Sequence, residues 1–394
     1  MAARVARERD GPVPRPFTIS VEDTVLTDLR RRLDATRWPD ETPGAGWAFG
    51  TDLQYLKSLI AYWRSDYDWR AQEAALNAFR HFTVAIDGID VHFIHEPGEG
   101  SAPLPLLLTH GWPGSIVEFQ KLIPLLTKPS AHGGDACDAF TIVAPSIPGY
   151  GLSFRANQRR LGLGEIADTF KFLMADVLGY PTFAAHGHDW GAFVATRLGY
   201  AYPEHLAAIH ITLLAIPRER VAGREPTPDE ERFYRQLDGW LKEECGYSWI
   251  MGTKPQTLAY ALTDSPVGLA AWIVEKFRSW SDCNGDVDAH LSRDVLLTNI
   301  MLYWVTGAIG SSFWPYYARL HEPWIVPSGT KVMVPTGYAE HPREMLTPPR
   351  SLAELTYGNI VRWTRMASGG HFPSLEAPQQ LAEEIRAFFR PLRS

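Results

Sequence analysis

Residues 182–192 are Thr-Phe-Ala-Ala-His-Gly-His-Asp-Trp-Gly-Ala, and they combine a short apolar run, a tight turn and the start of a helical pattern. The run Thr182–Ala185 predicts a buried strand, and Ala192–Tyr202 predicts a helix. One glycine stands two residues before Asp189 and another two residues after it, which permits a sharp turn where a Cβ atom would strike the neighbouring backbone. We therefore expect a strand–turn–helix unit that presents the Asp189 carboxylate at the end of its strand.

Similar apolar runs, bounded by glycine or proline, predict further strands. Because both faces of each run are apolar, they suit a parallel sheet that is covered on both sides; they are Leu104–Thr109, Thr141–Pro145, Ala207–Leu214 and Lys331–Pro335. Helical patterns such as Ile166–Leu178 lie between them. This alternation predicts an α/β protein with a mostly parallel central sheet and helices on both faces. With the turn at Asp189, it indicates the α/β-hydrolase fold.

The rest of the chain predicts two additions to this core. The N-terminal region is mainly helical in pattern, and Ser20 with Asp23 resembles a capping box before an apolar stripe. Alternating residues on either side of Asp87-Gly88 predict a hairpin from His81 onward. A long helical block rich in Trp and Tyr later interrupts the sheet pattern. The predicted division is an N-terminal meander over 1–80, a core over 81–216 and 328–394, and an inserted helical cap over 217–327.

Composition excludes several classes of protein. The chain has 394 residues, 45% of them hydrophobic, and a formal net charge of -7 with both signs mixed, so no basic surface for nucleic acid is expected. No run approaches the roughly 20 apolar residues of a membrane span, and Met1–Asp10 carries arginines without the apolar segment of a secretory signal. Three scattered cysteines predict neither a disulfide framework nor a zinc site. We expect a cytoplasmic enzyme.

An aspartate at the turn changes the chemistry that the fold supports. Lipases and esterases have serine there, whereas a carboxylate is already ionised at neutral pH and needs no base to attack. It is a weak nucleophile toward amides and esters but displaces at a strained or halogenated sp³ carbon. An isolated aspartate before a helix is more often a helix cap. The two glycines and the preceding strand favour the nucleophile interpretation for Asp189.

A second glycine-rich loop follows the strand Leu104–Thr109. In the α/β-hydrolase scaffold this loop supplies one backbone N–H of the oxyanion hole, and the residue after the nucleophile supplies the other. The loop is His110–Gly114, so the predicted donors are the main-chain N–H groups of Trp112 and Trp190. A plain Gly/Pro turn is the alternative for this loop taken alone.

Hydrolysis of an aspartyl ester requires a general base and an acid that orients it. His371 follows the last predicted strand and precedes the closing helix Gln379–Phe389, which matches the order nucleophile, acid, histidine. His186 and His188 lie beside the nucleophile on the turn, and we interpret them as structural. The acid should follow the strand Lys331–Pro335. Spacing leaves three candidates: Glu340, Glu344 and, more distantly, Glu354.

These residues resemble the microsomal-type epoxide hydrolases, especially their soluble bacterial and fungal members. The resemblance covers nearly the whole chain, and its motifs are Arg37-Trp38-Pro39, His110–Gly114, Gly187–Gly191, Thr263–Leu269, Asn299–Thr306 and Gly369–Phe372. The family's acid follows a Thr-Gly and a Pro-x-Glu pattern, which here falls on Glu344. Its two cap tyrosines, which protonate the epoxide oxygen, fall on Tyr247 and Tyr316, although a shift of one residue would select Tyr317. The membrane anchor of some members is not expected here.

The resemblance implies an epoxide hydrolase that forms vicinal diols through an alkyl ester on Asp189. It implies neither a metal nor an organic cofactor, and its partners are an epoxide substrate and water. It also suggests a role in the catabolism and detoxification of aromatic compounds. The sequence leaves a homodimer open, because the N-terminal segment could clamp the cap or line a dimer contact.

Two alternatives keep the same scaffold. A haloalkane or haloacid dehalogenase shares the aspartate and the histidine, but the haloalkane type commonly has Asn where this chain has Trp112. A catalytically silent binding protein is the other, and retention of all five proposed chemical positions argues against it. The aromatic residues of the cap, such as Trp240, Trp249, Trp280 and Phe313, suggest a bulky or aryl epoxide as substrate.

Overall fold

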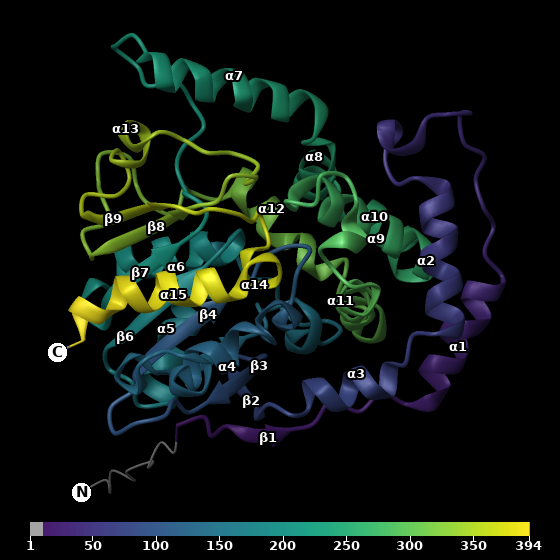
Figure 1. Ribbon diagram of the computed structural model, residues 1–394, viewed down its shortest axis with the longest axis horizontal. Helices are drawn as coiled ribbons and strands as arrows, with labels where there is room; N and C mark the ends of the chain where they lie inside the picture. The colour runs from purple at the N-terminus through teal and green to yellow at the C-terminus, as the bar shows by residue number, and fades with distance from the viewer. Residues whose placement is uncertain (1–10, 394) are drawn as a thin grey trace, which may run out of the picture.

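In the computed structural model, which describes residues 11–393, a single nine-stranded sheet forms the centre of the molecule (Figure 1). The strand order is β1-β2-β3-β5-β4-β6-β7-β8-β9. The strands from β5 to β9 in this order pair in parallel, while β1, β2 and β3 pair antiparallel at one side. The arrangement is the α/β-hydrolase fold that the sequence predicts.

The strands are short and, in the middle of the sheet, fully buried. Their bounds are β1 (Arg15–Phe17), β2 (His81–Ile86), β3 (Ile89–Glu96), β4 (Leu104–Thr109), β5 (Phe140–Pro145), β6 (Phe183–Gly187), β7 (Leu206–Ile211), β8 (Thr336–Glu340) and β9 (Ile360–Arg365). The hairpin between β2 and β3 turns at Asp87-Gly88, both with positive φ, as the pattern predicts.

Helices cover both faces of this sheet. On one face α4 packs against α15, and on the other α5 packs against α6 (Figure 1). The core helices are α4 (Leu122–Thr127), α5 (Leu163–Lys171), α6 (Trp190–Ala201), α13 (Arg350–Ala353), α14 (Pro373–Glu376) and α15 (Pro378–Phe389). The helix predicted over Ile166–Leu178 divides, since α5 continues as a π-helical segment over Phe172–Val177.

The predicted strand Lys331–Pro335 is wrong, and the strand is β8 instead. Val332 forms only an isolated bridge to Tyr357, and Pro335 has no N–H with which to continue a ladder. Pairing with β7 begins at Thr336, opposite Ile209. Therefore Glu340 belongs to the strand itself, and Glu344 lies just beyond it.

Six helices between β7 and β8 form the cap, over one end of the sheet (Figure 1). They are α7 (Pro228–Glu243), α8 (Gly246–Thr253), α9 (Pro255–Asp264), α10 (Pro266–Trp280), α11 (Arg293–Thr306) and α12 (Trp314–His321). Within residues 11–393, no single helix combines the length and apolar composition to cross a membrane. Two pairs of consecutive helices reach that length and composition when the two helices are counted together, but the helices of each pair meet at a bend, of 116° in one pair and 108° in the other.

The N-terminal segment runs along the side of the cap (Figure 1). Its helices are α1 (Asp23–Asp34), α2 (Leu53–Ser65) and α3 (Trp69–Leu76); α1 and α2 both pack against α10. The predicted capping box is wrong, because α1 begins at Asp23 after Glu22 and has no side-chain cap. The helix starts later than a cap at Ser20 requires. The arginines of Met1–Asp10 lie outside the described residues.

Candidate active site

Asp189 occupies a strained turn between β6 and α6. Its φ of 47° and ψ of -127° lie in a region that L-residues rarely adopt, at a typical cost of about 1–3 kcal/mol. A Cβ atom on Gly187 would lie 2.2 Å from the backbone of Gly191, and one on Gly191 would lie 1.9 Å from the Thr109 carbonyl oxygen. Both glycines are therefore required for the turn, which holds the carboxylate at the carboxyl end of the sheet.

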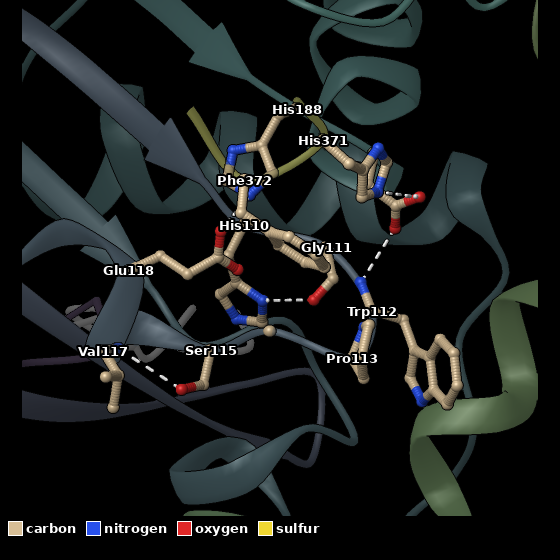
Figure 2. A network of polar contacts seen from close by, with 12 residues as sticks. His110, Gly111, Trp112, Pro113, Ser115, Val117, Glu118, His188, His371 and Phe372 are labelled. Atoms are coloured by element: carbon tan, nitrogen blue, oxygen red, sulfur yellow. Dashed lines mark hydrogen bonds and ion pairs between the residues drawn. The ribbon is translucent and has the colours of Figure 1, made fainter. Parts of the chain in front are cut away.

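One oxygen of this carboxylate already sits on the predicted oxyanion donors. The Trp112 N–H donates to Asp189 Oδ1 at 2.8 Å, and the Trp190 N–H also stabilises the carboxylate. Gly111 permits this approach, since a Cβ atom there would lie 2.3 Å from the Asp189 side chain. Figure 2 shows the Trp112 main chain and the His371 ring on opposite sides of one carboxylate, that of Asp189.

His371 lies between the carboxylate of Asp189 and that of Glu344, one of the three candidate acids. Its Nε2 is 3.4 Å from Asp189 Oδ2, and its Nδ1 is 2.8 Å from Glu344 Oε1. The His371 and Glu344 side chains are both fully buried. The His371 main-chain N–H donates to the Trp280 carbonyl at 2.8 Å, and the Trp280 ring packs edge-on against the imidazole. The histidine is thus fixed in orientation on both sides.

The other two candidate acids do not reach this histidine. Glu340 accepts a hydrogen bond from Trp363 Nε1 at 2.8 Å and lies on β8. Glu354 is exposed and pairs with Arg350 in α13. Glu344 also accepts from the Met345 N–H, which fixes its carboxylate. The structure therefore brings together Asp189, His371 and Glu344.

The charges of these groups depend on one another. Burial raises the pKa of Asp189, but the hydrogen bond and charge of His371 and the two main-chain donors outweigh it, so the pKa lies below its ordinary value. Burial lowers the pKa of His371, whereas the Glu344 and Asp189 carboxylates raise it by more, to well above its ordinary value. In the free protein the favoured state is a carboxylate facing an imidazolium.

Both predicted tyrosines line the cavity beside Asp189. The rings of Tyr247 and Tyr316 are 5.6 Å apart, and each packs against the Trp112 ring. Burial, the largest cause, and the nearby Asp189 charge hold the pKa of both phenols above its ordinary value, so they stay protonated donors. Tyr317 points elsewhere, stacked between Trp314 and His321. The geometry therefore favours Tyr316 over its neighbour.

A small cavity of about 30 Å³ adjoins these groups, and its lining includes Asp189, Trp190, Trp240, Tyr247 and Tyr316. Of the cap aromatics, Trp280 contacts His371 and Phe313 is buried in the core. Trp249 lies farther out, 53% exposed. The aromatic residues thus divide between the catalytic cavity, the core and the surface.

Sequence reasoning did not find the residues that hold the loop His110–Gly114 and the loop that carries His371. Asn299 Nδ2 donates to the Pro113 carbonyl at 2.7 Å, and the Tyr303 hydroxyl donates to the Gly114 carbonyl at 2.7 Å. Both come from α11, within a motif that the resemblance singles out without giving it a role. Glu376 accepts main-chain N–H groups from Gly370 and Phe372, beside His371.

The histidines of the turn make buried polar contacts away from the cavity. His188 Nε2 lies 2.6 Å from Glu118 Oε2, and Figure 2 shows both side chains. His186 Nδ1 lies 2.9 Å from His210 Nδ1. These contacts agree with the structural interpretation of His186 and His188, and nothing in the sequence spacing predicts Glu118 as a partner.

Fold and site together define an α/β hydrolase whose turn carries aspartate in place of serine. The family model for the alpha/beta hydrolase fold matches residues 105–244, and that for the epoxide hydrolase N terminus matches residues 14–119. The chain belongs to the epoxide hydrolase family.

Relatives and solved structures agree with this assignment. A Stigmatella aurantiaca protein provisionally named an epoxide hydrolase is 43% identical over 96% of this chain and 85% of its own length. Epoxide hydrolase 1 of Oryctolagus cuniculus is 37% identical over 95% and 88%. The crystal structure of the juvenile hormone epoxide hydrolase from Bombyx mori matches with a TM-score of 0.84, 30% identity and coverage of 97% and 95%. The protein is an epoxide hydrolase.

Proposed function

We propose that this epoxide hydrolase works through a covalent ester between Asp189 and the substrate. The observation that carries the proposal is the division of labour between the two carboxylate oxygens. Oδ1 is bound by the Trp112 N–H, whereas Oδ2 faces His371. This arrangement supports Oδ1 as the future ester carbonyl oxygen and Oδ2 as the nucleophile.

In the first step, Asp189 Oδ2 forms a bond to the less hindered epoxide carbon, and the ring C–O bond breaks. Tyr247 and Tyr316 polarise the epoxide oxygen, and one of them gives the departing alkoxide its proton. Both tyrosines lie close enough to Asp189 for its charge to raise the pKa of their phenols, which therefore remain protonated. The tyrosinate is then reprotonated at the expense of the His371 imidazolium.

Ester formation also prepares the base for the second step. Burial disfavours the imidazolium of His371, and the Asp189 charge is one of the causes that keep its pKa raised. Alkylation neutralises that charge, so the His371 pKa falls and the neutral ring can accept a proton from water. Hydroxide attacks Cγ of Asp189, and the oxyanion forms on the Trp112 and Trp190 donors. Collapse breaks the ester C–O bond, a proton passes to the leaving alkoxide, and the diol departs.

An isotope experiment tests the ester directly. A single turnover in ¹⁸O-water, with enzyme in excess, should leave the diol unlabelled and place ¹⁸O in the peptide that contains Asp189. Label in the diol on the first turnover would exclude the ester. Asp189→Asn should lower the single-turnover rate by at least about 10³-fold once deamidation is excluded by mass spectrometry. Unchanged activity in that variant would exclude Asp189 as nucleophile.

We also propose that the enzyme removes bulky or aryl epoxides within the cytoplasm, in the catabolism and detoxification of aromatic compounds. The aromatic lining of the cavity, from Trp190, Phe193, Trp240, Tyr247 and Tyr316, supports this substrate class. A panel of epoxides of increasing size tests it, with diol formation as the measurement. Turnover restricted to short aliphatic epoxides would contradict the proposal.

A further inference from the structure

A second cavity, here called the outer chamber, adjoins the catalytic cavity beneath the cap. It has a volume of about 930 Å³, and its lining includes Arg218, Leu241, Ser248, Arg319, Trp324 and Leu355. Four of its lining residues also line the catalytic cavity beside Asp189; they are Arg218, Ser248, Tyr316 and Arg319. The volume falls within the roughly 300–1,000 Å³ of small-molecule sites, so the chamber can hold the remainder of a substrate.

Two arginines occupy the junction between the cavities. Arg218 belongs to the loop after β7, and Arg319 belongs to α12. The low-polarity surroundings and the charge of Arg218 lower the pKa of Arg319 to about 9. Two like charges placed side by side repel each other unless an anion lies between them.

No carboxylate forms an ion pair with either guanidinium within the part of the chain that the structure describes. The largest electrostatic influences on Arg319 come from Arg218, Tyr247, Cys245 and Tyr316. Glu219 and Glu322 also line the chamber but form no ion pair with Arg218 or Arg319 in the described residues. Arg218 lies near the Cys245 thiol, which is a weak acceptor. By contrast, Arg220 of the same loop pairs with Glu231 at 2.8 Å.

Aromatic contacts account for part of this arrangement, and the Cys245 thiol accepts from Arg218. Arg218 lies 4.7 Å from the centre of the Trp240 ring. Arg319 lies 5.7 Å from Phe193 and 5.8 Å from Trp324. Stacking on rings holds the plane of a guanidinium, whereas its edge donors still require acceptors. Both arginines border the chamber that adjoins the cavity at Asp189.

We infer that Arg218 and Arg319 bind a carboxylate on the substrate, so that the preferred substrates are epoxides that carry a carboxylic acid. The inference rests on the proposed function, because it assigns the non-reacting end of the molecule that Asp189 attacks. A planar guanidinium pairs with a planar carboxylate through two parallel hydrogen bonds. The anion would offset the repulsion between the arginines and hold the epoxide carbon toward Asp189.

Matched acid and ester substrates test the inference. The para-carboxylate of styrene oxide, and the terminal epoxides of octanoic and undecanoic acid, are each compared with their methyl esters. For at least one pair we expect kcat/KM of the acid to exceed that of the ester by about 10- to 100-fold. Ester turnover equal to or faster than acid turnover for every pair would overturn the inference.

Variants assign the preference to the two arginines. Arg218→Met and Arg319→Met should each reduce the acid-to-ester ratio by about tenfold, while Arg319→Lys should retain part of it because the charge remains. Arg232→Met, a cap variant outside the chamber whose arginine pairs with Asp229, should leave the ratio as in the wild type. An unchanged ratio in both Arg218→Met and Arg319→Met would overturn the assignment.

Calorimetry separates this inference from the proposed function, because it needs no turnover. Benzoate should bind the intact wild-type chain at least about tenfold more tightly than benzamide, and Arg319→Met should abolish the difference. Equal binding of the two would overturn the inference. Loss of all epoxide opening with the benzoate preference intact would instead contradict the proposed function alone.

Discussion

At the scale of single residues, the catalytic geometry depends on where three acidic side chains end. Asp189 has a strained backbone conformation, and the turn that contains it requires glycine at positions 187 and 191. Glu344 is buried against His371, while Glu340 accepts a hydrogen bond from Trp363. The two glutamates are close in sequence, yet only one can orient the base. A substitution at each distinguishes their effects.

Glu344→Gln should slow hydrolysis of the ester by about 10²–10⁴-fold, because the carboxylate that orients and charges His371 is lost. Glu344 raises the His371 pKa, so this variant should shift it downward. Rapid-quench single-turnover kinetics should show the alkyl-enzyme accumulating. Glu340→Gln is the matched control, and it should leave ester hydrolysis within about threefold of the wild type. Equal defects in the two variants would contradict the assignment of Glu344.

The sequence singles out Asp189 as the candidate nucleophile but does not choose between the acids, and the reason is local. Glycine on both sides of Asp189 is what a sharp strand-to-helix turn requires, whereas an acid needs only to follow a strand. The predicted strand ends at Pro335, so both glutamates follow it in the prediction. The strand actually ends at Glu340, so of the two glutamates only Glu344 follows it. Since the sequence does not show this end, the choice required either the tertiary contacts or the family resemblance.

At the scale of elements, α6 shows how close packing fixes the site. The helix begins at Trp190, directly after the nucleophile, and Gly191 lies against the end of β4. The sequence predicts a helix from Ala192, because Trp190 and Gly191 are assigned to the turn although they already belong to the helix. The start of the N-terminal helix is missed for a related reason, because α1 begins without the side-chain cap that marks a helix in sequence.

Two glycine-to-alanine substitutions in helices should have opposite effects. Gly191→Ala places a methyl 1.9 Å from the Thr109 carbonyl oxygen, so the free energy of unfolding should fall by roughly 3 kcal/mol or more. Gly239→Ala in α7 meets nothing within 4 Å and should raise it by about 0.5–1 kcal/mol. Urea denaturation followed by circular dichroism measures both. Tolerance of Gly191→Ala would mean that the turn can relax.

At the scale of the whole molecule, polar contacts tie the cap to the core. One cluster lies where α7 begins: Glu230 completes a capping box with Thr227, pairs with Arg224, and accepts from Ser351 of the core helix α13. The helical pattern predicts a cap in this part of the chain, whereas it does not predict this link. It joins residues far apart in the sequence, and no local pattern records such a contact.

The link should make stability depend on pH. Arg224 and the hydrogen bonds lower the pKa of Glu230 from 4.5 to about 2, so its contribution is present above about pH 4.5 and is lost as the pH falls toward 2. Since the Arg224 side chain is 39% exposed, solvent screening reduces the contribution to about 1 kcal/mol. Denaturation of Glu230→Gln at pH 7 and pH 3 should show a deficit that shrinks at the lower pH. A deficit that is independent of pH would contradict this origin.

The hydrogen bonds from Asn299 and Tyr303 to the loop that carries Trp112 have a consequence for turnover. They anchor α11 to the loop that carries Trp112. A motion of the cap that displaced α11 would therefore also displace the predicted oxyanion donor. Substrate entry should therefore use the opposite flank, where α8 and α12 border the outer chamber. In this arrangement α8 and α12 move to admit substrate, while α11 stays in place and keeps Asp189 in its orientation.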